Sequence, residues 1–582
     1  MARQLERFEN LVSLFLTRAE EKGEQPFLWA KREGEWRSIS WAEAARQVAS
    51  LAASLKAIGL EPGDRVALVS ENRPEWLIAD LGIMAAGCVT VPTYTTNTTR
   101  DHAHVLGNSD ARAAIVSNQR LAKNLIPAVL TSSECHHVIA MEPLRTGQAP
   151  DWVNCHSWKK LVSGNADLAT LKQQIANIGR DDLACIIYTS GTGGAPRGVQ
   201  QHHGAILHNI AGAADIISTD FGWGDEVFLS FLPASHALEH TGGQLFPIGL
   251  GAQIYYAESL EKLAANIEET RPTIMIVVPR LFEMLRARIL KSLESSGGLS
   301  KYLFRRALKI GGDKYEGRLK PWDLPMDRIL ELTLRRKLRE KVGGRVKAWV
   351  SGGAPLNPEV GIFFQSLGIT FLQGYGQTEA APVISCNRPK AGIRLDTVGP
   401  PVKETEVRIA EDGEIMVRGE LVMHGYWRNP EETARVLSPD GWLATGDVGH
   451  FDDKGRIVIT DRKKDLIVND KGDNVSPQRI EGMLTLQPEI SQAMVYGDRR
   501  PHLVALLVPD PEIASAPDVQ GKLEAAVDRV NSDSSVIERV RRFIIADQPF
   551  SIENEQLTPS MKIRRHIISK AYGERLDKLY RN

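Results

Sequence analysis

The segment Tyr188-Thr-Ser-Gly-Thr-Gly-Gly-Ala-Pro-Arg-Gly-Val199 decides the fold class and the chemistry of this 582-residue chain. It follows the short apolar run Ala184-Cys-Ile-Ile-Tyr188, which is typical of a buried strand. Glycines allow a loop to turn tightly and to direct several backbone N–H groups at one anion. The hydroxyls of Thr189, Ser190 and Thr192 add hydrogen-bond donors. The pattern therefore predicts a strand followed by a loop that binds a polyphosphate.

Two well-known phosphate-binding patterns differ from this loop. A Walker A loop requires Gly-Lys followed by Ser or Thr, whereas the cation here is Arg197 and a glycine follows it. A dinucleotide-binding fingerprint requires a third glycine at the position of Pro196. A glycine-rich turn without a ligand is the alternative interpretation, and the density of hydroxyls beside Arg197 argues against it.

Around the loop, residues 40–290 alternate helical patterns with short apolar runs. Helical periodicity is present in Trp41–Ile58 and in Trp76–Ala86. Further strand-like apolar runs are Arg65–Ser70, Val89–Pro92, Ala113–Val116, Val227–Leu232 and Ile274–Val278. Short buried strands between helices predict an α/β fold, in which a large N-terminal domain contains parallel or mixed sheets flanked by helices.

After residue 390 the sequence becomes rich in short strands and tight turns. The turn sequences are Glu411–Gly413, Pro439–Gly441 and Asp452–Gly455. They predict a β-subdomain at about 390–460. The charged run Asp461-Arg-Lys-Lys-Asp465 follows, and beyond it the apolar segments suit a small α+β unit. We therefore expect an N-terminal domain at 1–461 and a C-terminal domain at 462–582.

Length and composition exclude several classes of protein. A chain of 582 residues is too long for one hydrophobic core, and a formal net charge of −1 gives no electrostatic case for nucleic-acid binding. The apolar run Leu11–Leu16 is too short for a secretory signal, and about 18 consecutive apolar residues occur nowhere. Five cysteines lie far apart and without metal-ligand spacing, which predicts reduced thiols in a cytoplasmic protein: Cys88, Cys135, Cys155, Cys185 and Cys386.

The segment 296–347 is predicted to be a basic helical insertion. Residues 301–347 contain 15 Lys and Arg against 6 Asp and Glu, interleaved with leucine and aromatic residues. One interpretation is a solvated helical excursion on the surface. The other is a patch that contacts anionic lipid head groups, because each basic residue near such a surface contributes about 1 kcal/mol. Both interpretations remain open at this stage, so peripheral contact with a membrane surface is a hypothesis.

Other motifs follow the loop in a fixed order along the chain. They are Phe231–His236 with Glu239, Arg271–Arg280, Ser351–Leu356, Gln373–Glu379, Gly425–Trp427, Thr445–Asp447, Gly472–Val475 and Pro559–Lys562. With the loop, this set resembles the adenylate-forming (AMP-binding) superfamily, which includes acyl-CoA synthetases, luciferases and peptide-synthetase adenylation domains. The resemblance covers roughly residues 30–570. The usual loop of that superfamily is Y-T-S-G-T-T-G-x-P-K-G-V, and this chain departs from it at Gly193 and Arg197.

The resemblance implies a site for ATP and AMP. Its residues would be Thr189, Ser190, Gly191, Thr192, Gly193, Gly194, Arg197, Gly352, Gly353, Ala354, Gln373, Gly374, Tyr375, Gly376, Thr378, Asp447 and Arg462.

Each role has a chemical reason. Tyr375 can stack on a base, and the Asp447 carboxylate can accept both hydroxyls of a ribose. Glu379, with Thr192, offers the oxygen ligands that Mg²⁺ prefers. Arg462 would meet the ribose or a phosphate. A turn cap for Asp447 and core packing for Tyr375 are the alternatives.

The resemblance also assigns roles in the C-terminal domain, which it implies is mobile. Lys562 would bridge the substrate carboxylate and the α-phosphate, because a cation between two anions holds them in line. Lys464 matches the hinge position, with Asp461 as second choice. Gly472 would border the channel for the coenzyme A arm, where a side chain would obstruct the close approach.

Asn72–Trp76, Val91–Thr96 and the insertion resemble the long-chain acyl-CoA synthetase branch, with His236 and His240 beside the acyl or coenzyme A pocket. The predicted enzyme is thus a long-chain fatty acid–CoA ligase that uses ATP, Mg²⁺ and coenzyme A. A fatty acyl-AMP ligase that serves a carrier protein is the main alternative. A luciferase-type oxygenase and an inactive binding relative are more distant ones. No nucleic-acid partner is expected, and a homodimer is left open.

Overall fold

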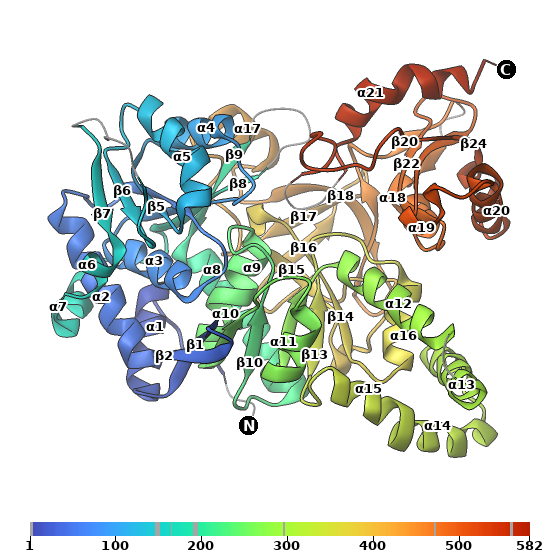
Figure 1. Cartoon of the computed structure of the whole chain (residues 1–582), viewed down its shortest axis with the longest axis horizontal. Helices are drawn as coiled ribbons and strands as arrows, with labels where there is room; N and C mark the ends of the chain where they lie inside the picture. The colour runs from blue at the N-terminus through green and yellow to red at the C-terminus, as the bar shows by residue number, and fades with distance from the viewer. Residues whose placement is uncertain are drawn as a thin grey trace.

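The computed structural model describes residues 4–145, 152–164, 166–189, 196–294, 297–470, 473–558 and 563–581 (Figure 1). Within these ranges the strands form five sheets. In spatial order the first sheet contains β7 (Asn154–Ser157), β6 (His137–Ala140), β5 (Ala111–Val116), β3 (Arg65–Val69), β4 (Val89–Thr93), β8 (Leu183–Thr189) and β9 (Arg197–His202). The second sheet contains β15 (Val383–Cys386), β14 (Phe371–Gly376), β13 (Ala348–Ser351), β12 (Ile274–Val277), β10 (Val227–Ser230), β11 (Gln253–Tyr256), β1 (Pro26–Arg32) and β2 (Glu35–Ser40).

Both large sheets are mixed. Neighbouring strands are parallel except at β8–β9, β1–β2 and β14–β15, where they are antiparallel. The helices of this part are α1 (Leu11–Lys22), α2 (Trp41–Ala57), α3 (Pro74–Ala85), α4 (Thr99–Ser109), α5 (Gln119–Thr131), α6 (Trp158–Val162), α7 (Leu168–Ile175), α8 (His203–Ile216), α9 (Ala237–Glu239), α10 (Phe246–Leu250), α11 (Leu263–Thr270), α12 (Pro279–Glu294) and α16 (Pro358–Ser366). The predicted α/β class with mixed sheets is therefore confirmed.

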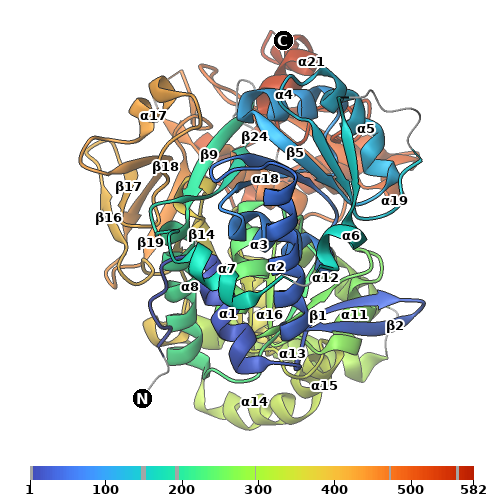
Figure 2. The same cartoon turned by 90° about the vertical axis from the view of Figure 1, so that its left-hand side faces the viewer.

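Strand β3 shows why these apolar runs become buried strands. Val66 and Leu68 pack into a core that α2 and α3 share with both sheets, whereas Ala67 and Val69 pack into a second core with α5. Successive side chains point to opposite faces of a strand, so a run that is apolar at every position is buried on both faces. Accordingly, α2 and α3 lie between the sheets, and α4 and α5 cover the far face of the first sheet (Figure 2).

The outer face of the second sheet is covered by α12, α16 and the first helix of the basic insertion. Phe282 of α12 packs in T-shaped contacts on Phe364 of α16 and Phe371 of β14. Helix α13 (Gly298–Tyr315) buries Phe304 in the same core, whereas α14 (Leu324–Leu330) and α15 (Arg336–Lys341) follow it along the surface (Figure 1). The insertion is therefore helical and anchored along one face.

A four-stranded antiparallel sheet follows, made of β16 (Glu406–Ile409), β17 (Glu414–Arg418), β18 (Leu443–Phe451) and β19 (Ile457–Arg462). Helix α17 (Pro430–Val436) lies between β17 and β18 in the chain. The predicted turns are confirmed at Gly413 and Gly455, whose φ angles of +82° and +72° favour glycine. Sequence patterns predicted this β-rich part from about residue 390.

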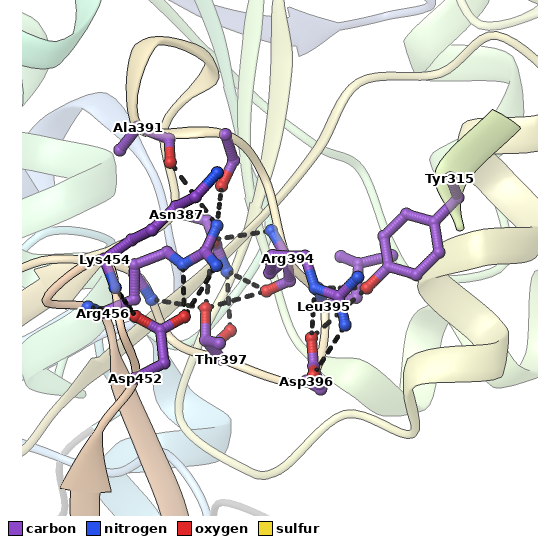
Figure 3. Close-up of polar contacts among 12 residues, drawn as sticks. Tyr315, Asn387, Ala391, Arg394, Leu395, Asp396, Thr397, Asp452, Lys454 and Arg456 are labelled. Carbon is purple, nitrogen blue, oxygen red and sulfur yellow. Dashed lines mark hydrogen bonds and ion pairs between the residues drawn. The ribbon is translucent and has the colours of Figure 1, made fainter. Parts of the chain in front are cut away.

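A polar network attaches this sheet to the body of the protein (Figure 3). The Arg456 guanidinium, in the β18–β19 hairpin, donates to Asp452 Oδ2 at 2.7 Å and to the Gly392 carbonyl at 2.8 Å. Farther along the same loop, the Leu395 N–H donates to the Tyr315 hydroxyl at 2.8 Å. The loop after β15 thus connects the end of α13 with the four-stranded sheet.

The C-terminal part has its own sheet and its own cores. The sheet consists of β22 (Ile490–Tyr496), β23 (Leu503–Pro509) and β24 (Val540–Ile545), preceded by the pair β20 (Ile467–Val468) and β21 (Asn474–Val475). Its helices are α18 (Pro477–Thr485), α19 (Pro511–Ala514), α20 (Val519–Ser532) and α21 (Arg565–Lys578). Along β23, Leu503 and Leu507 face α18 and α20, whereas Val504 and Leu506 face α21. This α+β unit therefore buries apolar residues on both faces of its sheet.

Candidate active site

The best-defined polar contact of the predicted nucleotide site joins Tyr375, Asp447 and Arg462. The Tyr375 hydroxyl donates to Asp447 Oδ2 at 2.7 Å, and Arg462 Nε lies 3.2 Å from Asp447 Oδ1. Asp447 and Arg462 face each other because they are paired across β18 and β19. Burial and the Asp447 charge raise the pKa of Tyr375, so its hydroxyl stays protonated and donates. Asp447 is 4% exposed, and this contact holds its carboxylate in one place.

A second contact chain links the phosphate-loop cation to the predicted metal ligand. Arg197 Nη1 lies 2.7 Å from Glu432 Oε2, and its guanidinium lies 4.4 Å from the ring centroid of Tyr426. The Tyr426 hydroxyl donates to Glu379 Oε1 at 2.8 Å. Burial, and then the Glu379 charge, raise the pKa of Tyr426. Arg197 and Glu379 are thus brought together through one aromatic ring.

Two ends of the phosphate loop are described, and they lie opposite each other. Thr189 ends β8, Arg197 begins β9, and the two residues are paired across this antiparallel ladder. Strands β8 and β9 are therefore antiparallel neighbours at the edge of the first sheet. Seven predicted site residues lie outside the described residues, namely Ser190, Gly191, Thr192, Gly193, Gly194, Gly472 and Lys562.

The predicted adenine loop follows β13, beside the end of β14. Ser351 at the end of β13 is paired with Gln373, and Gly352, Gly353 and Ala354 continue from it. Gln373 is 8% exposed, and its Oε1 has no hydrogen-bond partner in the described part of the chain. A buried amide oxygen without a partner is costly, so it marks a place where a ligand donor would be stabilising.

Gly376 in this strand is required for space, whereas a Cβ at Gly374 would make only ordinary contacts. A Cβ at Gly376 would lie 1.8 Å from the Pro382 carbonyl oxygen, and one at Gly374 would lie 3.6 Å from the Ser385 oxygen. Just beyond, the Thr378 carbonyl accepts a hydrogen bond from Gln201 Nε2 at 2.7 Å. The strand that carries Tyr375 is thereby packed closely against β15 and tied to β9.

The two predicted hinge residues differ in environment. Lys464 is exposed. Asp461 is 4% exposed, and its Oδ1 accepts a hydrogen bond from the Arg462 backbone N–H at 2.5 Å. Burial raises the pKa of Asp461. Asp461 thus belongs to the packed end of β19, whereas Lys464 lies beyond it, and the hinge assignment stays a prediction.

The predicted acyl-pocket residues are partly in the protein core. His236 caps the short helix α9, with its Nδ1 accepting from the Leu238 N–H at 3.2 Å. His240 is fully buried, and its Nε2 lies 2.8 Å from Asp80 Oδ2. Its ring lies edge-on to Trp76 at 5.6 Å. The contact of either histidine with an acyl chain stays a prediction.

Sequence reasoning missed several partners in this region. Tyr426 and Glu432 were not singled out, although Tyr426 lies in the Gly425–Trp427 motif that carried the resemblance. Asp80 lies in the middle of α3 and carried no motif. A carboxylate in the middle of the apolar run from Trp76 to Ala86 was the available signal, because a buried charge requires a partner.

Glu239 is expected to make the protein less stable as the pH rises from about 5 to about 8. Burial raises the pKa of Glu239 to about 8, against the hydrogen bonds from Ser230 and Gln244. In the unfolded chain a glutamate titrates near 4.3. The folded state therefore binds more protons in this window, and stability falls as the pH increases. Relative to wild type, the free energy of unfolding of Glu239→Gln should increase by roughly 3 kcal/mol between pH 5 and pH 8. Thermal unfolding at several pH values measures it.

The exposed Glu524→Gln is the matched control and should show the same pH dependence as the wild type. A constant difference in unfolding temperature between Glu239→Gln and wild type from pH 5 to pH 8 would contradict this account of Glu239.

Comparisons with known proteins agree on one family. The AMP-binding enzyme family matches residues 15–427, and the AMP-binding enzyme C-terminal domain matches residues 464–582. The long-chain-fatty-acid–CoA ligase FadD15 of Mycobacterium tuberculosis is 31% identical over 587 residues, which cover 94% of this chain and 93% of that protein. The peroxisomal long chain acyl-CoA synthetase 7 of Arabidopsis thaliana is 30% identical over 592 residues, covering 94% and 82%.

Solved structures share the fold. The adenylation domain of a carboxylate reductase from Mycobacterium chelonae aligns with a TM-score of 0.75 at 23% identity, covering 99% of this chain and 92% of that one. A benzoate CoA ligase from Burkholderia xenovorans aligns with a TM-score of 0.73 at 22% identity, covering 96% and 100%. Because the first family match alone spans more than half of the sequence, the chain belongs to the AMP-binding enzyme family.

Proposed function

We propose that the protein is a long-chain fatty acid–CoA ligase that forms an acyl-adenylate from ATP and then transfers the acyl group to coenzyme A. The observation that carries the proposal is the buried Asp447 carboxylate, held by Tyr375 and Arg462 where a ribose diol would bind. Relatives at about 30% identity over most of the chain are named for this substrate class.

The chemistry proceeds in two displacement steps. An oxygen of the fatty carboxylate forms a bond to the α-phosphorus of ATP, and the bond to pyrophosphate breaks. The coenzyme A thiol then loses its proton to solvent, its sulfur bonds to the acyl carbonyl carbon, and AMP leaves as the bond between that carbon and the phosphate oxygen breaks. Lys562, on the sequence argument above, would hold the two anions of the first step in line.

Magnesium fits the Glu379 carboxylate. A carboxylate offers two oxygens with about four acceptor sites, and the Tyr426 hydroxyl uses one of them. The remaining oxygen sites suit a hard cation, which would offset phosphate charge when bound. Arg197, beside the same tyrosine, would exchange its contact with Glu432 for a phosphate.

The proposal is tested with palmitate, ATP and Mg²⁺, with and without coenzyme A, by following pyrophosphate, adenylate and thioester. We expect pyrophosphate to be released in both cases and thioester to form only when coenzyme A is present. Adenylate that persists with coenzyme A but is consumed by an acyl carrier protein would favour the alternative ligase. One Arabidopsis thaliana relative, 28% identical, is named as a long-chain-fatty-acid–[acyl-carrier-protein] ligase.

We also propose that the helical insertion contacts anionic membrane surfaces. Several large apolar side chains are exposed there, with Leu299 and Trp322 each 73% exposed and Leu332 66% exposed. The basic residues of this segment are interleaved with them in the sequence. Apolar side chains among lysines and arginines suit the interface of a bilayer with anionic head groups. No helix in the described ranges is long and apolar enough to cross a bilayer.

Charge reversal on α15 is expected to weaken vesicle binding. Arg336 and Lys337 are both exposed. The double variant R336E/K337E changes the charge by four and should lower partitioning onto vesicles with anionic lipid at least about 10-fold, at about 1 kcal/mol per basic residue. Sedimentation with anionic and with neutral vesicles measures it.

Lys123→Glu, on the exposed side of α5, is the control and should bind like the wild type. Equal binding of the wild-type protein to anionic and neutral vesicles would refute the electrostatic contact.

A further inference from the structure

Three side chains that are far apart in the sequence converge beside β9. Asp181 precedes β8, His202 ends β9, and His424 lies in the segment that leads to Tyr426. Their candidate ligand atoms all lie within 4.8 Å of one another, and His424 Nε2 is 2.9 Å from Asp181 Oδ1. Two imidazoles and a carboxylate are a ligand set typical of zinc and related transition metals.

The surroundings of His202 favour a ligand role. Its Nδ1 lies 2.9 Å from the Arg180 carbonyl oxygen and 3.2 Å from the Ala205 N–H, for which it is the capping acceptor of α8. Metal binding through Nε2 requires the tautomer with the proton on Nδ1, and the Arg180 carbonyl can accept that proton. Metal-binding histidines commonly donate their second N–H to a backbone carbonyl in this way. That tautomer leaves a lone pair on Nε2 for a metal ion.

The lone pair of His202 Nε2 then faces another acceptor. The Val422 carbonyl oxygen lies 3.3 Å from it. In the other tautomer the Nε2–H donates to this carbonyl, whereas in the metal-binding tautomer both atoms are acceptors and a cation between them would offset their repulsion. In a tetrahedral zinc site with bonds of 2.0–2.1 Å, neighbouring ligand atoms are about 3.4 Å apart. The observed separation of 3.3 Å would fit two ligands on one edge of such a site.

One side chain must turn for the site to close. The rings of His202 and His424 are stacked, with centroids 4.4 Å apart and planes 11° from parallel. An imidazole binds a metal in its own ring plane, so the His424 ring has to rotate. Its side chain is 33% exposed, which leaves room. The backbone here is fixed by two hydrogen bonds with Gln200. The His424 N–H donates to the Gln200 carbonyl at 3.1 Å, and the Gln200 N–H donates to the Gly425 carbonyl at 3.0 Å.

We propose that Asp181, His202 and His424 bind one divalent transition-metal ion of the zinc class, with the Val422 carbonyl oxygen beside them. The ion would join the end of β9 to the segment that carries Tyr426. Because Tyr426 donates to Glu379, the site would stabilise the strand pairing behind the catalytic carboxylate. The inference depends on these contacts and not on the choice of acyl substrate.

The experiment uses full-length protein stripped with a chelator and titrated with Zn²⁺ against a chromophoric competitor. Each chain is expected to bind one Zn²⁺ ion with high affinity, and the unfolding temperature of the protein should increase when it does. His424→Ala, at a partly exposed position, should weaken the binding of this Zn²⁺ ion about 100-fold or more and abolish the increase in unfolding temperature. Co²⁺ in place of Zn²⁺ should give the visible absorption of a tetrahedral site in wild type only.

The matched control uses the other close histidine pair. His137 Nδ1 lies 3.0 Å from His156 Nε2, and His156→Ala should leave the Zn²⁺ equivalent unchanged. Three outcomes would overturn the proposal: no tight equivalent in the wild type, unchanged binding in a folded His424→Ala variant, or loss of binding in His156→Ala.

Discussion

Asp447→Ala is expected to lower kcat/KM for ATP in adenylate formation by about 100-fold or more. Asp447 accepts from the Tyr375 hydroxyl and pairs with Arg462, so its carboxylate is preset to accept ribose hydroxyls. Each charge-assisted hydrogen bond contributes roughly 1.5–3 kcal/mol. Losing two of them costs about 3 kcal/mol or more, which lowers kcat/KM for ATP by at least about 100-fold. Pyrophosphate release at varied ATP and at varied fatty acid measures the effect.

The effect should fall on ATP and leave the KM for the fatty acid nearly unchanged. Asp453→Ala, an exposed residue of the hairpin between β18 and β19, is the matched control and should behave as wild type. Asp447→Asn, which keeps the shape and loses the charge, should fall between the two. A well-folded Asp447→Ala enzyme with wild-type KM and kcat for ATP would exclude the ribose role.

Lys562→Ala should separate the two half-reactions. Removing a cation that stabilises the charge of a transition state costs about 100- to 1,000-fold in rate. Adenylate formation, measured by pyrophosphate exchange, should fall by this factor. Thioester formation from chemically prepared acyl-adenylate and coenzyme A should stay near the wild-type rate, because the sequence argument gives Lys562 a role only in the first step.

Lys570→Ala, on the exposed side of α21, controls for the loss of a positive charge nearby. Equal losses in both half-reactions of Lys562→Ala would indicate a structural role. Adenylate formation at the wild-type rate would remove Lys562 from the mechanism.

Local sequence patterns predicted the elements whose burial is simple. The apolar run at β3 is buried on both faces, and a run of this kind has few other stable arrangements. Likewise, glycine at 413 and 455 takes the positive φ that its turn requires. The hairpin of β1 and β2 was not predicted, because β2 is a largely exposed strand at the sheet edge and lacks an apolar alternation.

Side-chain partners across the chain could not be predicted in the same way. The resemblance named Glu379 and Arg197, but only the fold places Tyr426 between them. His424 and Asp181 are 243 residues apart, so a search for metal-ligand spacing could not have found them. A contact of this kind depends on the pairing of β9 with a distant segment, which leaves no local periodicity.

The position of Arg462 at the end of β19 bears on how the acyl-adenylate is retained between the two half-reactions. Arg462 is the last residue of that strand and is paired with Asp447, while the chain leaves the sheet immediately afterwards. A reorientation of the residues beyond 463 between the two half-reactions would leave this pair in place. The AMP moiety could then stay bound through both half-reactions, and the acyl-adenylate would not have to dissociate and bind again.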